Sequence, residues 1–162
     1  VDGTGDPTFP RRIEEALIAA VEANPNLALW VRRHPSEARA DEIRAANRPR
    51  VRVAPPEMPL HACIHASDEV IVTVSTVGVE AHLAGKRVTQ VRGSILDHLS
   101  PYLQMGIADR ELTVAALPQA YAAQHSPAAA SARRPLEAVG NATGRVVEVL
   151  RSVATPKDGH GG

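Results

Sequence analysis

Two hydroxyl residues, Ser75 and Thr76, stand between a strongly apolar segment and the start of an expected helix. The first backbone N–H groups of a helix lack partners within the helix and carry the positive end of its dipole, which stabilises a phosphate. Gly78 has no side chain, so a phosphate could approach the backbone closely. Glu80 lies about one helical turn beyond Thr76, where its carboxylate would accept hydrogen bonds from the hydroxyls of a ribose. The pattern predicts a nucleotide site, although an ordinary N-cap followed by a solvated glutamate would also produce it.

A second group of polar residues closes the apolar segment at residues 27–32. Arg32 and His34 are two residues apart, so both side chains leave an extended strand on the same face. Pro35 follows and restricts the turn. A histidine at that position would donate a hydrogen bond to a phosphate or act as an acid. We take His34 as the candidate catalytic residue and Arg32 as a candidate binding residue, with a solvated strand end as the equal alternative.

The remaining candidates are weaker. His61 and His65 lie four residues apart on an expected helix, a spacing that can bind a metal, but no third ligand is evident. Cys63 is typical of a small core residue. Residues 2–6 contain two glycines and precede a helix, yet they match neither the dinucleotide fingerprint nor the Walker A motif. We therefore expect no metal site and no cofactor other than a donor substrate.

The elements that must position these residues alternate between strands and helices. Apolar and β-branched runs predict strands at residues 27–32, 51–53, 69–74 and 87–91. Periodic segments predict helices at residues 10–23, 35–47, 59–67, 77–84, 111–123 and 135–153. This alternation indicates an α/β fold of the Rossmann-like kind, with a mainly parallel sheet flanked by helices. Ligands bind beyond the carboxyl ends of such strands, where both polar groups fall.

Length and composition limit the possible classes of protein. The 162 residues suit one domain, which we place at residues 1–153, with a disordered tail at residues 154–162. Eighteen basic and eighteen acidic residues give a formal net charge of zero, which argues against a general nucleic-acid binder. One cysteine favours a reducing compartment, and no apolar run is long enough to cross a bilayer. The expected location is cytoplasmic, or peripheral at the inner membrane.

Three stretches together resemble the C-terminal, donor-binding half of a GT-B glycosyltransferase. They are VRRHP at residues 31–35, ASDEVIVTVSTVGVEA at residues 66–81 and AGKRV at residues 84–88. The stretch from residue 27 to residue 91 is similar to bacterial capsule and surface-polysaccharide transferases, including sialyltransferases and Kdo transferases. The full series is fairly specific for this superfamily, whereas no single piece of it is.

The resemblance implies roles for individual residues. In sialyltransferase-like members the histidine of the His-Pro pair contacts the nucleotide phosphate, which corresponds to His34. The hydroxyl pair that holds phosphate corresponds to Ser75 and Thr76, and the ribose-binding glutamate of UDP-sugar members corresponds to Glu80. The cationic residue before the His-Pro pair corresponds to Arg32. The implied substrate is a CMP- or UDP-linked sugar.

The sequence also departs from this family. A GT-B enzyme has two Rossmann-like halves, and the N-terminal half, with the acceptor site, has no counterpart in these 162 residues. The first strand of the C-terminal half is missing or reduced to Val1. The expected function is therefore donor binding, with an N-terminal GT-B domain as partner and little activity alone. The alternatives are a domain like UDP-N-acetylglucosamine 2-epimerase and a non-catalytic module that binds a nucleotide or a partner chain.

Overall fold

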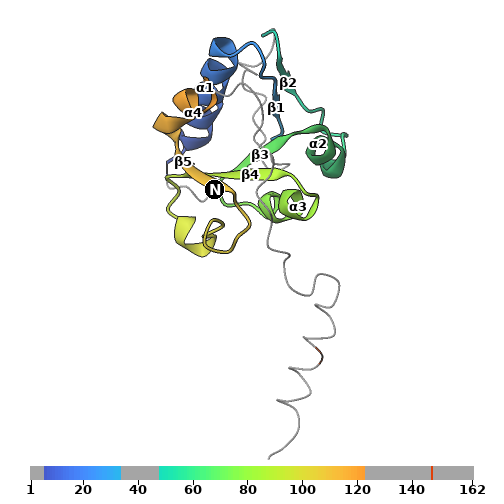
Figure 1. Ribbon diagram of the computed structural model, residues 1–162, viewed down its shortest axis with the longest axis vertical. Helices are drawn as coiled ribbons and strands as arrows, with labels where there is room; N and C mark the ends of the chain where they lie inside the picture. The colour runs from blue at the N-terminus through green and yellow to red at the C-terminus, as the bar shows by residue number, and fades with distance from the viewer. Residues whose placement is uncertain (1–5, 34–47, 123–146, 148–162) are drawn as a thin grey trace, which may run out of the picture.

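The chain forms an α/β fold in which helices flank two small parallel sheets, consistent with the Rossmann-like class (Figure 1). The computed structural model describes residues 6–33, 48–122 and 147. In chain order the elements are α1 (Phe9–Ala23), β1 (Leu29–Val31), β2 (Val51–Val53), α2 (Leu60–Ala66), β3 (Glu69–Val72), α3 (Val77–Leu83), β4 (Arg87–Arg92), the 3-10 turn η1 (Asp97–Leu99), β5 (Arg110–Thr113), the 3-10 turn η2 (Val114–Ala116) and α4 (Leu117–Ala122).

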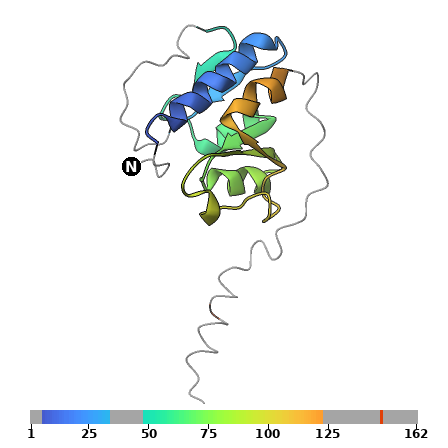
Figure 2. The ribbon, with the colours of Figure 1, turned by 90° about the vertical axis from the view of Figure 1, so that its left-hand side faces the viewer.

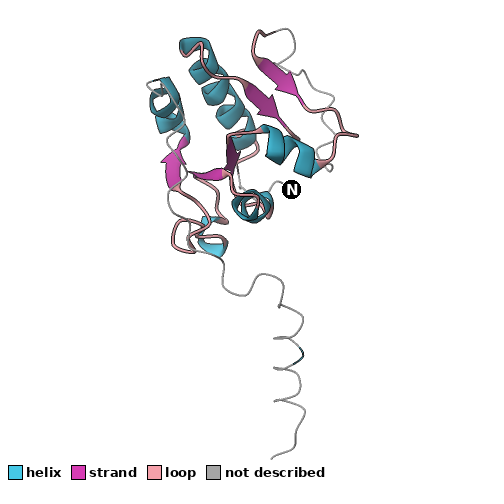
Figure 3. Cartoon of the chain, turned by 45° about the vertical axis from the view of Figure 1, so that its right-hand side comes forward, coloured by secondary structure: helices cyan, strands magenta, loops and turns pink. Residues whose placement is uncertain are grey.

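All of the strand pairs are parallel among the described residues. β1 pairs with β2, and β3, β4 and β5 form a second sheet in that order. Across the molecule the strands follow one another as β2, β1, β3, β4 and β5 (Figure 1 and Figure 3). β1 and β3 are therefore neighbours in space, but no ladder of hydrogen bonds joins them within the described part of the chain.

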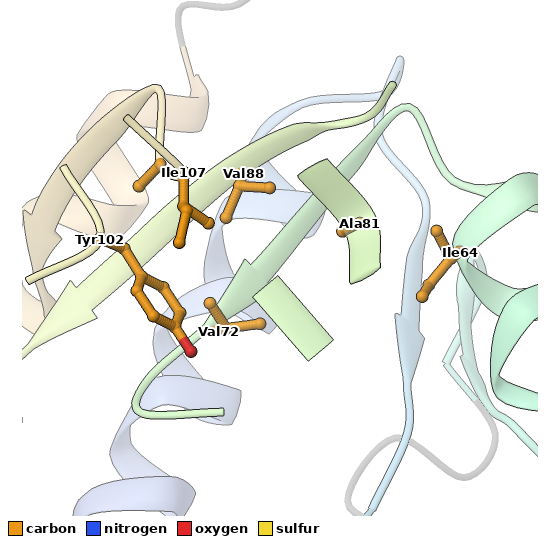
Figure 4. Close-up of a cluster of buried hydrophobic side chains, with 7 residues drawn as sticks. Ile64, Val72, Ala81, Val88, Tyr102 and Ile107 are labelled. Atoms are coloured by element: carbon orange, nitrogen blue, oxygen red, sulfur yellow. The ribbon is translucent and has the colours of Figure 1, made fainter. Parts of the chain in front are cut away.

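The core lies in layers on the two faces of the larger sheet. Alternate residues of a strand point to opposite faces, and on β4 Val88 joins one cluster and Val91 joins another. The Val88 cluster packs under α2 and α3 and includes Ile64, Val72, Ala81, Tyr102 and Ile107 (Figure 4). The Val91 cluster packs under α1 and α4, which lie side by side over the other face (Figure 2).

A third cluster lies between α1 and the smaller sheet. It consists of Ile18, Val21 and Val51, with Leu27 and Leu29 packed against it. Leu27 also packs against the Val91 cluster. The smaller sheet thus has its own core cluster, separate from the two clusters of the larger sheet except where Leu27 contacts both.

One expected element is wrong. Residues 111–123 were predicted as a single helix, but the structure has the strand β5, the turn η2 and then the short helix α4. Parallel pairing with β4 fixes residues 110–113 as a strand, because Thr89 lies opposite Arg110 and Arg92 lies opposite Thr113. Tertiary pairing outweighs the local helical pattern here.

The other described elements match their predictions to within two or three residues. The strand expected at residues 27–32 is shorter, and its central residue Trp30 is 45% exposed. The expected helix at residues 35–47 lies outside the described residues. So do the expected helix at residues 135–153, apart from the helical Val147, and the expected tail at residues 154–162.

Candidate functional site

The turn from β3 into α3 brings Ser75 and Thr76 to the carboxyl edge of the larger sheet. The Ser75 hydroxyl accepts a hydrogen bond from the Val77 N–H at 3.3 Å, and the Ser75 carbonyl accepts one from the Gly78 N–H at 3.0 Å. Thr76 is the N-cap residue of α3 and makes no side-chain capping bond, whereas Ser75, one residue earlier, closes the turn. The turn itself therefore uses two of the N–H groups that the sequence assigned to a phosphate. A hydroxyl that accepts one hydrogen bond still has its own proton to donate.

Thr76 and Glu80 are the exposed members of the group. The Thr76 carbonyl accepts hydrogen bonds from the N–H groups of Val79 and Glu80, at 3.0 and 3.1 Å. Neither the Thr76 hydroxyl nor the Glu80 carboxylate has a hydrogen-bond partner among the described residues. Both side chains can therefore meet a ligand without breaking an existing interaction.

Gly78 has a packing role that its place in the motif did not reveal. It is buried, and a Cβ built on it would lie 2.7 Å from Cε2 of Tyr102 and 3.1 Å from Cγ2 of Val72. Cβ atoms essentially never approach another atom as closely as 2.7 Å. The close approach at Gly78 is thus made by the Tyr102 ring, which packs directly against the first turn of α3 (Figure 4).

Tyr102 and Gln90 hold the turn in place. The Tyr102 hydroxyl donates to the Ser75 carbonyl at 2.6 Å. The fully buried Gln90 accepts from the Tyr102 N–H at 3.1 Å and donates to the carbonyls of Thr73 and Ser100 at 3.3 and 2.8 Å. One buried amide therefore joins the end of β3 to the loop after β4.

Sequence reasoning missed Gln90 and Tyr102 as positioning residues. A usable signal was present, because Gln90 is a long polar residue in an expected strand that also contains Val88 and Val91, and a buried polar group must find partners. The position of those partners, ten to seventeen residues away along the chain, is not visible in the pattern.

Arg32 follows β1, at the carboxyl edge of the smaller sheet. Its Nη1 donates to the Met58 carbonyl and lies 3.8 Å from Sγ of Cys63. No carboxylate forms an ion pair with Arg32 among residues 6–33 and 48–122, whereas Arg33 lies 3.7 Å from Glu14. His34, the predicted catalytic residue, lies outside the described residues.

A separate polar cluster lies at the opposite, amino edge of the larger sheet. Glu69, at the start of β3, accepts hydrogen bonds from Arg87 at 2.7 Å and from Arg110 at 3.0 Å. Thr89 and Tyr121 also donate to it, Tyr121 at 2.8 Å, and the Arg110 guanidinium lies 4.7 Å from the centre of the Tyr121 ring. These residues fasten the starts of three strands to α4, so the cluster stabilises the fold at the edge away from Ser75.

Burial, with a smaller contribution from the nearby Glu69 carboxylate, raises the pKa of Tyr121 to about 12. The phenol is therefore neutral at ordinary pH and acts as a hydrogen-bond donor. Arg110 favours the ionised phenol, but its effect is smaller than that of burial.

The described part of the chain holds no group of three or more His, Cys, Asp or Glu side chains arranged to bind a metal ion. Among the same residues no helix is long and apolar enough to span a membrane.

Comparisons with known proteins do not assign a family. A scan of protein-family models, a search of curated proteins and a search of solved structures each returned no match.

Proposed function

We propose that this chain binds a nucleotide at the carboxyl edge where β1 and β3 end. The observation that carries the proposal is a reversal of direction in the strand order. From β1 the chain proceeds outward to β2, whereas from β3 it proceeds outward the other way to β4 and β5. In open parallel sheets ligands bind at such a reversal, beyond the carboxyl ends of the strands.

The side chains at this point suit a phosphorylated ribose. Arg32 supplies a positive charge that no described carboxylate neutralises, and Ser75 and Thr76 supply hydroxyl donors. Glu80 offers an exposed carboxylate of the type that accepts hydrogen bonds from ribose hydroxyls. Arginine and hydroxyl donors stabilise the charge that develops on a departing phosphate.

We further propose that the nucleotide is the leaving group of a sugar donor, CMP- or UDP-linked, as the resemblance to GT-B glycosyltransferases implies. In that assignment His34 contacts the phosphate, and an N-terminal GT-B domain supplies the acceptor site. A domain like UDP-N-acetylglucosamine 2-epimerase would present the same edge to UDP. A non-catalytic nucleotide-binding module would also use it, without turning over the sugar.

Isothermal titration calorimetry with CMP, UDP and GDP tests the binding proposal. We expect heat with at least one nucleotide and much less with the matching nucleoside, because the phosphate contributes charge-assisted hydrogen bonds. Absence of heat with all three nucleotides would overturn the proposal.

The variant Glu80→Ala should weaken binding about 10- to 100-fold, the equivalent of about 1.5–3 kcal/mol for a hydrogen bond to a charged group. Glu22→Ala is the matched control, since Glu22 is an exposed glutamate in the last turn of α1. Equal affinity in the Glu80 and Glu22 variants would remove Glu80 from the site.

A further inference from the structure

The backbone of β1 presents an unpaired edge on the side away from β2. The Leu29 N–H donates to the Arg50 carbonyl at 2.8 Å, and the Ala54 N–H donates to the Val31 carbonyl at 2.9 Å. Leu29 and Val31 thus direct their backbone groups toward β2. Because these directions alternate along a strand, Trp30 between them directs its N–H and C=O to the other side. That side faces β3 (Figure 1).

The backbone of β3 presents a matching edge. The Asp109 N–H donates to the Val88 carbonyl at 2.8 Å, so Val88 faces β5 and its neighbour Thr89 faces β3. Ile71 lies opposite Thr89 in the parallel register. In a parallel pair, when the backbone N–H and C=O of one residue point to the neighbouring strand, those of the residue opposite point away from it. The N–H and C=O of Thr89 point to β3, so those of Ile71 point away from β4 and toward β1.

These two edges do not satisfy each other. Within the described ranges β1 pairs only with β2 and β3 pairs only with β4, and no turn or loop hydrogen bond reaches the backbone of Trp30 or Ile71. β1 and β3 also approach each other less closely than β1 and β2 or β3 and β4 do. Backbone groups in the interior of a fold are nearly always paired, so two facing open edges require a partner.

Helix α1 indicates where that partner connects. The helix begins at the carboxyl edge, because a Cβ on Gly93, directly after β4, would lie 2.7 Å from the Phe9 ring. It ends near the start of β1, where the Asn24 side chain donates to the Tyr121 carbonyl. α1 therefore runs antiparallel to the strands, as a helix does when it follows a parallel strand.

The handedness of the crossover connections determines on which side of β1 a strand that precedes α1 would lie. The crossovers through α2 and α3 both lead toward β5, and both helices cover the Val88 face. α1 covers the opposite face and leads into β1. Since crossovers are right-handed, a helix on the opposite face serves a step in the opposite direction. The strand before α1 must therefore lie on the β3 side of β1.

We propose that one further strand, in the polypeptide that leads into α1, inserts between β1 and β3 and pairs with both in parallel. It would merge the two sheets into one of the order β2, β1, inserted strand, β3, β4, β5. Because α1 covers one face there and α2 the other, the strand is apolar and β-branched on both faces. Leu27, which packs against two clusters, marks the line along which their cores join.

Amide hydrogen exchange measured by NMR tests the open edges in the 162-residue chain as it stands. The amides of Trp30 and Ile71 should exchange at least about tenfold faster than that of Leu29, which is bonded to Arg50. Protection of Trp30 and Ile71 equal to that of Leu29 would show that both edges are already paired, and would overturn the proposal.

A second measurement tests the inserted strand. The chain is extended ahead of Val1 by VTVIVV, with an extension GSGSGS of equal length as control. The apolar extension should slow exchange at Trp30 and Ile71 at least about tenfold, while the control leaves both rates unchanged. Equal rates in the two extended chains, or protection that depends on protein concentration and so comes from a second copy, would contradict it. Neither measurement uses a nucleotide, so its failure is separate from failure of the proposed function.

Discussion

The substitution Gly78→Ala separates a packing role for this glycine from a ligand-binding role. Gly78 lies in the first turn of α3, where alanine is the better helix former and would by itself stabilise the fold by about 0.5–1 kcal/mol. The added methyl group, however, would lie 2.7 Å from the Tyr102 ring and 3.1 Å from Val72. Relief of that overlap requires movement of the ring or of the helix.

The expected cost can be worked from these contacts. Overpacking a buried position costs about 1–3 kcal/mol. Displacement of the ring also endangers the hydrogen bond from the Tyr102 hydroxyl to the Ser75 carbonyl, which contributes about 0.5–1.5 kcal/mol. After subtraction of the gain in helix propensity, Gly78→Ala should lower the free energy of unfolding by about 1–3.5 kcal/mol.

Chemical denaturation measures this difference, and a double-mutant cycle assigns its cause. In a Tyr102→Leu background the overlap with the ring is gone and only the 3.1 Å contact with Val72 remains, so most of the cost of Gly78→Ala should disappear. Refutation would be a Gly78→Ala protein that is as stable as the parent, or one whose loss of stability persists unchanged in the Tyr102→Leu background. A stable Gly78→Ala protein that loses nucleotide affinity would instead give Gly78 the ligand-binding role.

Three further predictions concern the amino edge of the sheet. Because burial raises the pKa of Tyr121 to about 12, the contribution of the neutral Tyr121 phenol to stability should be complete below pH of about 10 and decline toward pH 12. The difference in alkaline absorbance between the parent and Tyr121→Phe should titrate near 12. Glu69→Gln should lower the free energy of unfolding by about 2–4 kcal/mol in urea denaturation, while Glu15→Gln at an exposed ion pair changes it by less than about 0.5 kcal/mol; equal effects would contradict the buried network. Asn24→Ala removes a buried bond to the Tyr121 carbonyl and should lower the thermal midpoint, with a loss of about 1–3 kcal/mol; an unchanged midpoint would contradict that role.

Local patterns were sufficient for the elements that carry the candidate site. The run at residues 70–72 is apolar and β-branched, and the hydroxyl pair and Gly85 bracket the helix that follows. These signals lie within a few residues of the structure they specify. The position of Ser75 and Arg32 at carboxyl ends of strands follows from them.

Elements that depend on distant partners were not predictable in the same way. β5 has only one large apolar residue, Leu112, and is fixed by pairing with β4 and by the bond from Arg110 to Glu69, 41 residues away. Likewise, Gln90 and Tyr102 act on the Ser75 turn across the fold. A pattern in one sequence indicates that Gln90 needs partners but does not identify them.

The central claim, a nucleotide site at the carboxyl edge, is tested most directly by following backbone amide shifts during titration with CMP, then UDP. The account predicts that the shifts concentrate at Thr76, Glu80 and Arg32, and that Glu69 and Arg110 at the opposite edge stay unmoved. Shifts centred on the Glu69 cluster, or none at saturating nucleotide, would contradict it.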